Sequence, residues 1–339
     1  MKQDYLLSCL YLTRKCPMHC KYCAIRNSEL QERELTVSEW KKAFDILKSL
    51  DCKFNLILGN ETMMLGDGLV DIVKHLSETE TNYALYSTSP TKLYNELKEP
   101  LIKAGLKNLS SGFDSLKRDD SIGIKSRRGL NGMIDMKKRI KTLDTQGTIT
   151  LSSINLDEVV DLLRTLTKNG IWGAVNSLHW NIDGKYDFFP SKEQLGDLVI
   201  TDEKKFLKLC AELKKLTLNG EIMIQNPPEY FDALAKYGLN MGWHCTEPYI
   251  VTVDADGHLR LCAYRRGEKV SKFTIFDLAD EKKFEEYKKV WKEESQECPG
   301  CFWSYYWMAE NFIFTDQKEY GTKVLQDHHS KYYKGEKGS

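Results

Sequence analysis

The sequence predicts an α/β protein, a partial (β/α)6 TIM-like barrel followed by a small C-terminal domain. Short apolar segments alternate with amphipathic helical segments six times before about residue 180, the pattern of a parallel sheet covered by helices. From about residue 183 this alternation becomes irregular, and beyond Trp243 a hairpin and a group of cysteines replace it. A chain of 339 residues is long enough for such a core and one further domain.

The individual elements follow from apolar periodicity and from helix and turn signals. Thr36 and Glu39 form a capping box that begins the first helix, because each side chain satisfies a free backbone N–H of the first turn. Strands are expected at 5–12, 54–58, 83–86, 106–109, 147–152, 171–180 and 221–225, and later helices at 65–78, 91–103, 132–143, 155–168, 203–217 and 281–293. In a barrel of this kind the loops after the strands meet on one face, where the chemistry is expected.

Composition narrows the possible functions. Lys plus Arg and Asp plus Glu both number 49, so the net charge indicates no nucleic-acid-binding surface. The chain shows no secretion signal and no apolar run of membrane-spanning length, so we expect a cytoplasmic protein without a membrane partner. Ten cysteines are many for a reducing compartment, where clustered cysteines bind metal or perform redox chemistry. Seven fall into two groups, and Cys9, Cys52 and Cys210 are expected to be packing residues.

The first cysteine group consists of Cys16, Cys20 and Cys23, directly after the first predicted strand. Three thiolates at this spacing can bind three irons of a [4Fe–4S] cluster and leave the fourth iron open. A structural zinc site is the alternative, but it requires a fourth ligand, for which only His19 is near enough. The Cys-x₃-Cys-x₂-Cys motif and its position after a strand resemble the radical SAM superfamily over about residues 5–225.

The resemblance implies that S-adenosylmethionine (SAM) binds the open iron and is cleaved reductively to a 5′-deoxyadenosyl radical, which removes a hydrogen atom from a substrate. An electron donor such as flavodoxin or ferredoxin is then expected. The matching positions assign Tyr22 to the adenine and Gly59, Asn60 and Glu61 to the methionine amino group, although Asn60 replaces the family's middle glycine. Ser87, Ser89, Ser111 and Asp114 are candidates for the ribose or substrate or, alternatively, ordinary turn caps. Arg128 is the candidate for the SAM carboxylate, with Arg127 as its competitor.

The second cysteine group consists of Cys245, Cys262, Cys298 and Cys301, and a predicted hairpin with the turn Asp254–Gly257 precedes Cys262. This arrangement resembles the SPASM extension, or its shorter twitch form, in which four thiolates bind one auxiliary [4Fe–4S] cluster. A zinc ribbon is the alternative, since four cysteines satisfy zinc equally well. The predicted divisions are a radical SAM core over 1–228, an auxiliary-cluster domain over 229–315 and a tail over 316–339.

The sequence therefore predicts a radical SAM enzyme that oxidises, dehydrogenates or cross-links a peptide or small molecule. Epimerisation of a peptide or sugar is an alternative, as is a non-enzymatic zinc-binding interaction protein. The chain begins close to its first strand, so no N-terminal peptide-recognition domain is expected, and a small-molecule substrate competes with a peptide. Beyond the cysteines no catalytic residue is assigned, but His179, Trp180 and Asn181 end the sixth strand and are candidate substrate contacts.

Overall fold

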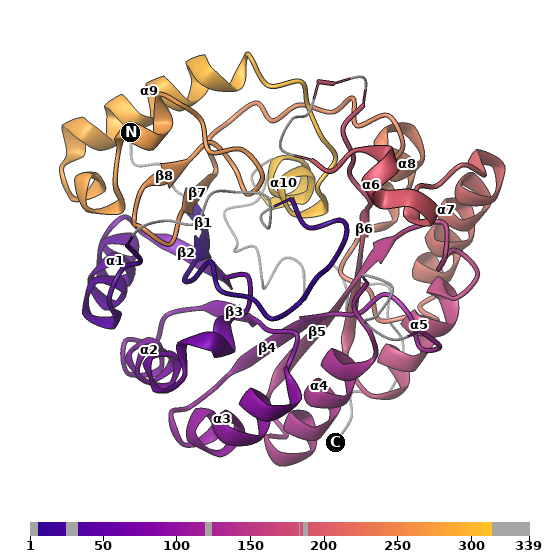
Figure 1. Cartoon of the computed structure of the whole chain (residues 1–339), viewed down its shortest axis with the longest axis horizontal. Coiled ribbons are helices and arrows are strands. Elements are labelled where there is room, and N and C mark those ends of the chain that lie inside the picture. Colours follow the sequence, from indigo (N-terminus) through magenta and orange to yellow (C-terminus); the bar gives the residue numbers. More distant parts are fainter. Residues whose placement is uncertain (1–5, 25–32, 119–123, 183, 186–188, 314–339) are drawn as a thin grey trace.

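The computed structural model describes residues 6–24, 33–118, 124–182, 184–185 and 189–313. They form one sheet of eight strands in the order β6-β5-β4-β3-β2-β1-β7-β8. Neighbouring strands from β6 to β7 run parallel, and only β8 pairs antiparallel, with β7. Figure 1 shows these strands as an arc with helices outside it. The predicted α/β partial barrel is therefore confirmed.

The strands are β1 (Leu6–Tyr11), β2 (Cys52–Leu58), β3 (Tyr83–Tyr86), β4 (Asn108–Gly112), β5 (Asp144–Leu151), β6 (Trp172–Ser177), β7 (Ile250–Val253) and β8 (Leu259–Arg260). The helices are α1 (Val37–Ser49), α2 (Asp67–Glu78), α3 (Thr91–Lys103), α4 (Arg128–Arg139), α5 (Val159–Lys168), α6 (Lys192–Leu195), α7 (Glu203–Leu218), α8 (Pro228–Tyr237), α9 (Glu281–Ser295) and α10 (Ser304–Met308).

Most predicted elements lie where the sequence placed them, and the exceptions have local causes. The Thr36–Glu39 capping box is present at the start of α1. Residues 221–225 were expected to form a strand, but Ile224 makes only an isolated parallel bridge to Gly173. The two prolines that follow cannot donate to a sheet. Instead Pro228 occupies the first turn of α8, a position that needs no N–H donor.

The C-terminal hairpin continues the sheet of the barrel. β7 pairs with β1 from Leu7 opposite Ile250 to Leu10 opposite Val253, so the segment that carries the second cysteine group is hydrogen-bonded to the strand before the first. Helix α10 lies between the two ends of the arc: Ser304 donates to the Asn176 side chain on β6, and the Tyr306 hydroxyl lies 2.9 Å from that of Thr252 on β7. The division into domains at residue 228 stays a prediction, and the tail over 316–339 lies outside the described residues.

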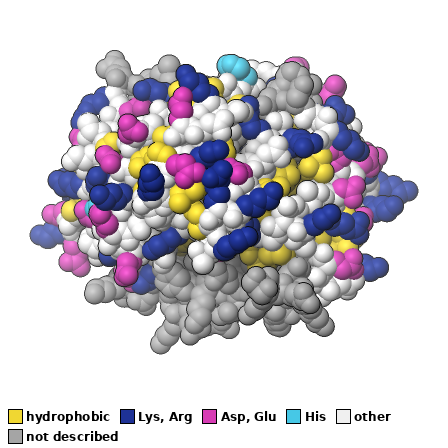
Figure 2. Space-filling view, turned by 90° about the horizontal axis from the view of Figure 1, so that it is seen from below, with side chains coloured by type: hydrophobic (Ala, Val, Ile, Leu, Met, Phe, Trp, Pro, Cys, Tyr) yellow, Lys and Arg dark blue, Asp and Glu magenta, His cyan; other side chains and the backbone are white. Residues whose placement is uncertain are grey.

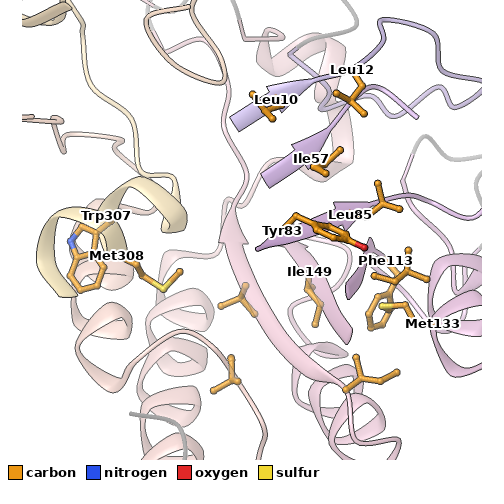
Figure 3. Close-up of a cluster of buried hydrophobic side chains, with 14 of the residues drawn as sticks. Leu10, Leu12, Ile57, Tyr83, Leu85, Phe113, Met133, Ile149, Trp307 and Met308 are labelled. Atoms are coloured by element: carbon orange, nitrogen blue, oxygen red, sulfur yellow. The ribbon is translucent and has the colours of Figure 1, made fainter. Parts of the chain in front are cut away.

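Alternation along the strands separates two interior surfaces. Leu10, Ile57, Leu85 and Ile149 project from neighbouring strands into the main core (Figure 3) between sheet and helices, because successive side chains of a strand point to opposite faces. Residues one position away, such as Tyr11 on β1, face the inside of the arc. The sheet therefore packs helices on its convex side and leaves its concave side for a site.

The surface is mixed in charge. Figure 2 shows Lys and Arg side chains interspersed with Asp and Glu on one face, around a band of hydrophobic side chains. Among the helices described, none combines the length and apolar character needed to cross a lipid bilayer.

Candidate active site

The three cysteines of the first group border one cavity of about 530 Å³ inside the arc. They lie on the loop after β1, and the Cys23 backbone N–H donates to the Cys20 carbonyl at 3.3 Å. Burial raises the pKa of the Cys16 thiol and raises that of Cys20 to about 12, and each is raised further by the other cysteines of the loop. The Cys16 and Cys20 thiols are therefore protonated when nothing is bound, and a metal must displace those protons.

A half-buried lysine that the sequence did not indicate lies near these thiols. Lys125 borders the same cavity, and its ammonium lies 5.6 Å from the centre of the Tyr22 ring. Burial alone would lower the pKa of Lys125, but Cys20, Asp114 and the other two loop cysteines raise it above its ordinary value. An ammonium and three thiols in one cavity fit an anionic metal–thiolate group, because the cation offsets its charge in a low dielectric.

Tyr22 is held in a defined position at the cavity wall. Its hydroxyl donates to Asp114 Oδ2, and that carboxylate also accepts the backbone N–H groups of Lys125 at 3.0 Å and Thr150 at 2.9 Å. Burial followed by the Asp114 charge raises the pKa of Tyr22 well above its ordinary value. Asp114 does not border the cavity, so it positions the predicted adenine-side ring and presents no group to a ligand.

The segment Gly59–Glu61 after β2 is joined to the loop that leads to Cys16. The Asn60 backbone N–H donates to the Thr13 carbonyl, and the Glu61 N–H to the Lys15 carbonyl, both at 3.0 Å. Gly59 and Asn60 border the cavity, whereas Glu61 does not. A Cβ on Gly59 would make only ordinary van der Waals contacts, at 3.4 Å from Thr13 and Thr62, so the packing here does not itself require a glycine.

The Glu61 carboxylate is fully used within the protein. It is 1% exposed, and it accepts from Ser87 Oγ at 2.6 Å, Thr88 N–H at 2.8 Å, Thr88 Oγ1 at 2.5 Å and Met63 N–H at 3.1 Å. The carboxylate thereby joins the ends of β2 and β3. The contact between Glu61 and the methionine amino group stays a prediction. Of the residues in this hydrogen-bonded segment, those at the cavity surface are Gly59, Asn60, Ser87 and Thr88.

Two other predicted SAM contacts lie behind the cavity wall. Ser111 is fully buried, and a Cβ on Gly129 of α4 would lie 1.9 Å from its Oγ. The hydroxyl therefore faces α4, because strand alternation turns Ser111 outward where Gly112 turns inward. Arg128 begins α4, and its Nη2 lies 2.8 Å from Met18 Sδ in the cysteine loop. Met18 borders the cavity and Arg128 does not, so the arginine contacts the loop itself.

The second cysteine group surrounds a separate, smaller cavity of about 30 Å³. All four members border it, together with Trp243, Leu261, Tyr264, Trp291, Ser295, Gly300, Trp303 and Tyr306. Burial raises the pKa values of Cys245 and Cys301 well above the ordinary value, and neighbouring cysteines of the group raise them further. Four thiols around one small, largely apolar space fit a fully cysteine-ligated group.

Defined backbone contacts hold this cysteine group together. Cys301 N–H donates to the Trp243 carbonyl at 2.9 Å. The Trp291 indole donates to the Leu261 carbonyl at 2.7 Å, which fixes the backbone beside Cys262. Gly300 has a φ of +95°, a left-handed conformation that a residue with a side chain rarely adopts, and this turn directs Cys301 to the cavity.

Two aromatic side chains separate the cavities. Tyr264 and Trp303 border both, and their ring centroids lie 5.5 Å apart. Burial raises the pKa of Tyr264 well above its ordinary value, and Cys301, Cys262 and Cys23 raise it further, so cysteines of both groups lie near this hydroxyl. The two cysteine groups therefore face each other across this aromatic wall.

A buried ion triad also connects the two groups. Asp254, with no exposed surface, pairs with Arg14 through Oδ1 and with Arg260 Nη1 through Oδ2 at 2.6 Å. Arg14 lies two residues before Cys16, and Arg260 lies two residues before Cys262. Both guanidinium groups lie over the Tyr11 ring, at 5.2 and 5.7 Å from its centre.

The large cavity has two chemically different walls. Apolar residues from β1 to β3 form one wall: Leu7, Tyr11, Phe54, Leu56, Leu58, Ala84 and Tyr86. Uncharged polar residues line the other: Asn108, Gln146, Thr148, Thr150, Asn176, Ser177, Gln225 and Ser304. Arg14 and Lys125 also border the cavity, and no Asp or Glu does so among the residues the structure describes.

Among the residues that the structure describes, no three or more His, Cys, Asp or Glu side chains converge on a point where they could bind a single metal ion. A cubane cluster distributes its cysteines over separate irons, so its ligands need not converge on a single point.

Comparison with known proteins defines the class. A family model described as the radical SAM superfamily matches residues 10–187, and the chain therefore belongs to this superfamily. Membership implies SAM and a [4Fe–4S] cluster as cofactors, and the protein is a radical SAM enzyme.

Individual relatives are more distant. The chain is 23% identical over 272 residues to a GTP 3′,8-cyclase of Clostridium perfringens, covering 77% of this chain and 80% of the relative. It is 28% identical over 160 residues to a PqqA peptide cyclase of Bradyrhizobium diazoefficiens, covering 46% and 41%. A solved structure, histidine-tagged anSMEcpe with bound AdoMet, superposes with a TM-score of 0.54 at 15% identity over 96% of this chain and 99% of that one.

Proposed function

We propose that this enzyme cleaves SAM at a cluster held by Cys16, Cys20 and Cys23, and that a second [4Fe–4S] cluster bound by Cys245, Cys262, Cys298 and Cys301 assists oxidation of the substrate. One observation carries the proposal: three thiols border a large cavity, and four thiols border a small one that shares Tyr264 and Trp303 with it. When bound, the first cluster and SAM supply a 5′-deoxyadenosyl radical that removes a substrate hydrogen atom.

The chain's own residues position the reactants and exclude water. Tyr22, held by Asp114, offers an aromatic face at the cavity wall. Lys125 offsets negative charge beside the thiolates. Helix α10 covers the gap between β6 and β7 and contributes Ser304, Tyr305 and Met308 to the lining, so the radical is shielded from solvent.

The substrate proposed is a peptide segment or a small molecule. The names of the two relatives point to GTP for one and to a peptide for the other. The apolar and the uncharged polar wall of this cavity suit an amphipathic group better than a triphosphate, which requires several cations. A reductant such as flavodoxin or ferredoxin and a cytoplasmic location complete the proposal.

Oxidation, dehydrogenation or cross-linking is favoured over epimerisation by the thiols present. An epimerase of the thiol-dependent kind returns a hydrogen atom to the substrate radical from a cysteine. Among the described residues, the only cysteines that border the large cavity are the three of the cluster loop. Cys210 is buried in α7 within the main core, so it offers no hydrogen atom to the cavity.

Metal analysis and a cleavage assay test the proposal. The anaerobically purified protein should contain about eight irons, as two cubanes require, and should form 5′-deoxyadenosine from SAM under reduction. Replacing Cys16, Cys20 and Cys23 by Ala should abolish 5′-deoxyadenosine, while the Cys52→Ala control retains it. Zinc without iron would refute the proposal in favour of the zinc-binding alternative. Continued cleavage in the triple variant would refute the assignment of the SAM-cleaving cluster to Cys16, Cys20 and Cys23.

A further inference from the structure

His179, directly beyond β6, has one ring nitrogen fixed by the protein. It is 5% exposed, and its Nε2 lies 3.0 Å from the Phe302 carbonyl oxygen, to which Ser177 Oγ also donates at 3.0 Å. A carbonyl oxygen can only accept a hydrogen bond, so Nε2 carries the proton. The other nitrogen, Nδ1, therefore presents a lone pair.

This lone pair belongs to a ring at the cavity surface. His179 borders the large cavity, and its ring is held by Phe189 and Tyr264 at centroid distances of 5.1 and 5.2 Å. Within the described parts of the chain, Nδ1 makes no hydrogen bond. The hydrogen-bond contacts of the ring, to Ser177 and the Phe302 carbonyl, are made by Nε2. Nδ1 is not one of the fully buried, unpartnered side-chain atoms of the described residues, so a ligand or a water molecule in the cavity can donate to it.

The ring remains neutral in the working pH range. Burial lowers the pKa of His179 to about 4, so the imidazole accepts hydrogen bonds and carries no charge at neutral pH. The adjoining wall of the cavity offers the amides of Asn176 and Gln225 and the Ser304 hydroxyl. Neutral donors and acceptors of this kind suit groups that are themselves uncharged.

We propose that His179 orients the substrate by accepting a hydrogen bond at Nδ1 from an uncharged N–H or O–H group, such as an amide or an alcohol. This assignment rests on the proposed function, because it takes the large cavity as the substrate site. The Phe302 carbonyl sets the ring orientation and follows Cys301 in the chain. His179 thereby joins the substrate cavity to the loop of the second cysteine group.

Two substitutions separate the orienting role from a merely structural one. In His179→Gln the longer amide can place its NH₂ where Nε2 donates to Phe302, but it removes the acceptor at Nδ1. In His179→Asn the shorter amide can place its oxygen near Nδ1, but it gives up the Phe302 contact. His75→Gln is the control, because it makes the same change at a histidine that pairs with Asp45 and does not border the cavity.

Trifluoroacetamide serves as the probe, and its binding to the cluster-loaded enzyme is measured by ¹⁹F NMR titration. Trifluoroacetate has the same shape but offers a negative charge and no donor. Trifluoroacetamide should bind the wild type and shift the His179 Nδ1 ¹⁵N resonance. His179→Gln should raise its Kd about 3- to 10-fold, the effect of one neutral hydrogen bond. The Kd values for His179→Asn and His75→Gln should stay within about twofold of the wild type.

The opposite ranking, with His179→Gln like the wild type and His179→Asn weakened, would show that His179 only anchors Phe302 and would overturn the assignment. Equal binding of trifluoroacetate, or no Nδ1 shift, would overturn it as well. The Kd of SAM should be unchanged in His179→Gln, and a raised Kd would make His179 a SAM contact instead. SAM cleavage by the wild type tests the proposed function separately, so the two failures are distinguishable.

Discussion

The two cysteine groups occupy cavities of opposite character. Cys16, Cys20 and Cys23 border a space of about 530 Å³ that has mixed polar and apolar walls and is also lined by Lys125. The four cysteines of the second group border about 30 Å³, enclosed by Trp243, Trp291 and other apolar side chains. A metal group with an open coordination position needs space for a ligand, whereas a fully ligated one does not. The large cavity thus belongs to the group of three thiols, and the small cavity to the group of four.

The largest expected effect tests whether the two groups are independent. Replacing Cys298 and Cys301 by Ala removes two of the four thiols around the small cavity and should reduce bound iron by about half, since one cubane of two is lost. Formation of 5′-deoxyadenosine should continue. The matched double variant Cys52→Ala and Cys210→Ala should keep all its iron. Iron and 5′-deoxyadenosine assays on anaerobic protein decide the matter, and a complete loss of iron would show that the groups form a single site.

The next largest effect concerns the ion triad that connects the groups. Asp254→Asn preserves the side-chain shape but leaves Arg14 and Arg260 buried without a counter-charge, which should lower the free energy of unfolding by about 3–5 kcal/mol. Asp232→Asn, which breaks the exposed pair with Lys214, should cost at most about 1 kcal/mol. Denaturant unfolding measures both. A similar small loss for the two variants would mean that the triad does not stabilise the junction.

The sequence predicted the alternating elements well because local periodicity and capping determine them. The Thr36 capping box and the cysteine spacing are local patterns of this kind. The triad was not predictable, since Arg14 and Asp254 are 240 residues apart and meet only because β7 pairs with β1. Lys125 gave no signal for the same reason: nothing in its neighbourhood in the chain shows that it faces the cysteine loop.

Candidate site residues were predicted best where the motif itself is local. All seven cysteines border the two cavities, in the groups expected, and Tyr22 borders the larger. Ser111 lies in β4 and Glu61 follows β2, but the structure directs their side chains away from the cavity. The inward or outward direction of a residue at a strand end depends on the register of the sheet, and a shift of one position reverses it.

His179, at the boundary of the two regions, should make the free energy of unfolding depend on pH. An unfolded histidine binds a proton below a pKa of about 6.5, whereas folded His179 does so only below about 4. Between these values the unfolded state binds more protons, so the free energy of unfolding falls as pH falls. Relative to His179→Gln, the free energy of unfolding of the wild type should fall by up to about 3 kcal/mol between pH 7 and pH 4. Parallel pH profiles in denaturant titrations would reveal instead that His179 is protonated in the folded protein.

The smallest effect compares two buried carboxylates, one in each region. Glu61 joins the ends of β2 and β3 beside the large cavity, and Glu294 of α9 accepts the backbone N–H groups of Glu268, Lys269 and Val270 behind the Cys262 loop. Glu→Gln at either position exchanges an acceptor oxygen for a donor, which should lower the free energy of unfolding by about 2 kcal/mol.

The two variants should differ in ligand binding, although their stabilities fall alike. Glu61→Gln displaces the segment that presents Gly59 and Asn60 to the cavity, so the Kd of SAM should rise, while Glu294→Gln should leave it unchanged. Unfolding in denaturant and SAM titration of the cluster-loaded enzyme measure the two quantities. If Glu61→Gln weakens SAM binding without any loss of stability, the carboxylate itself contacts the SAM ammonium, as the motif predicts. If stability and SAM affinity fall together, Glu61 acts by holding the strand ends in place.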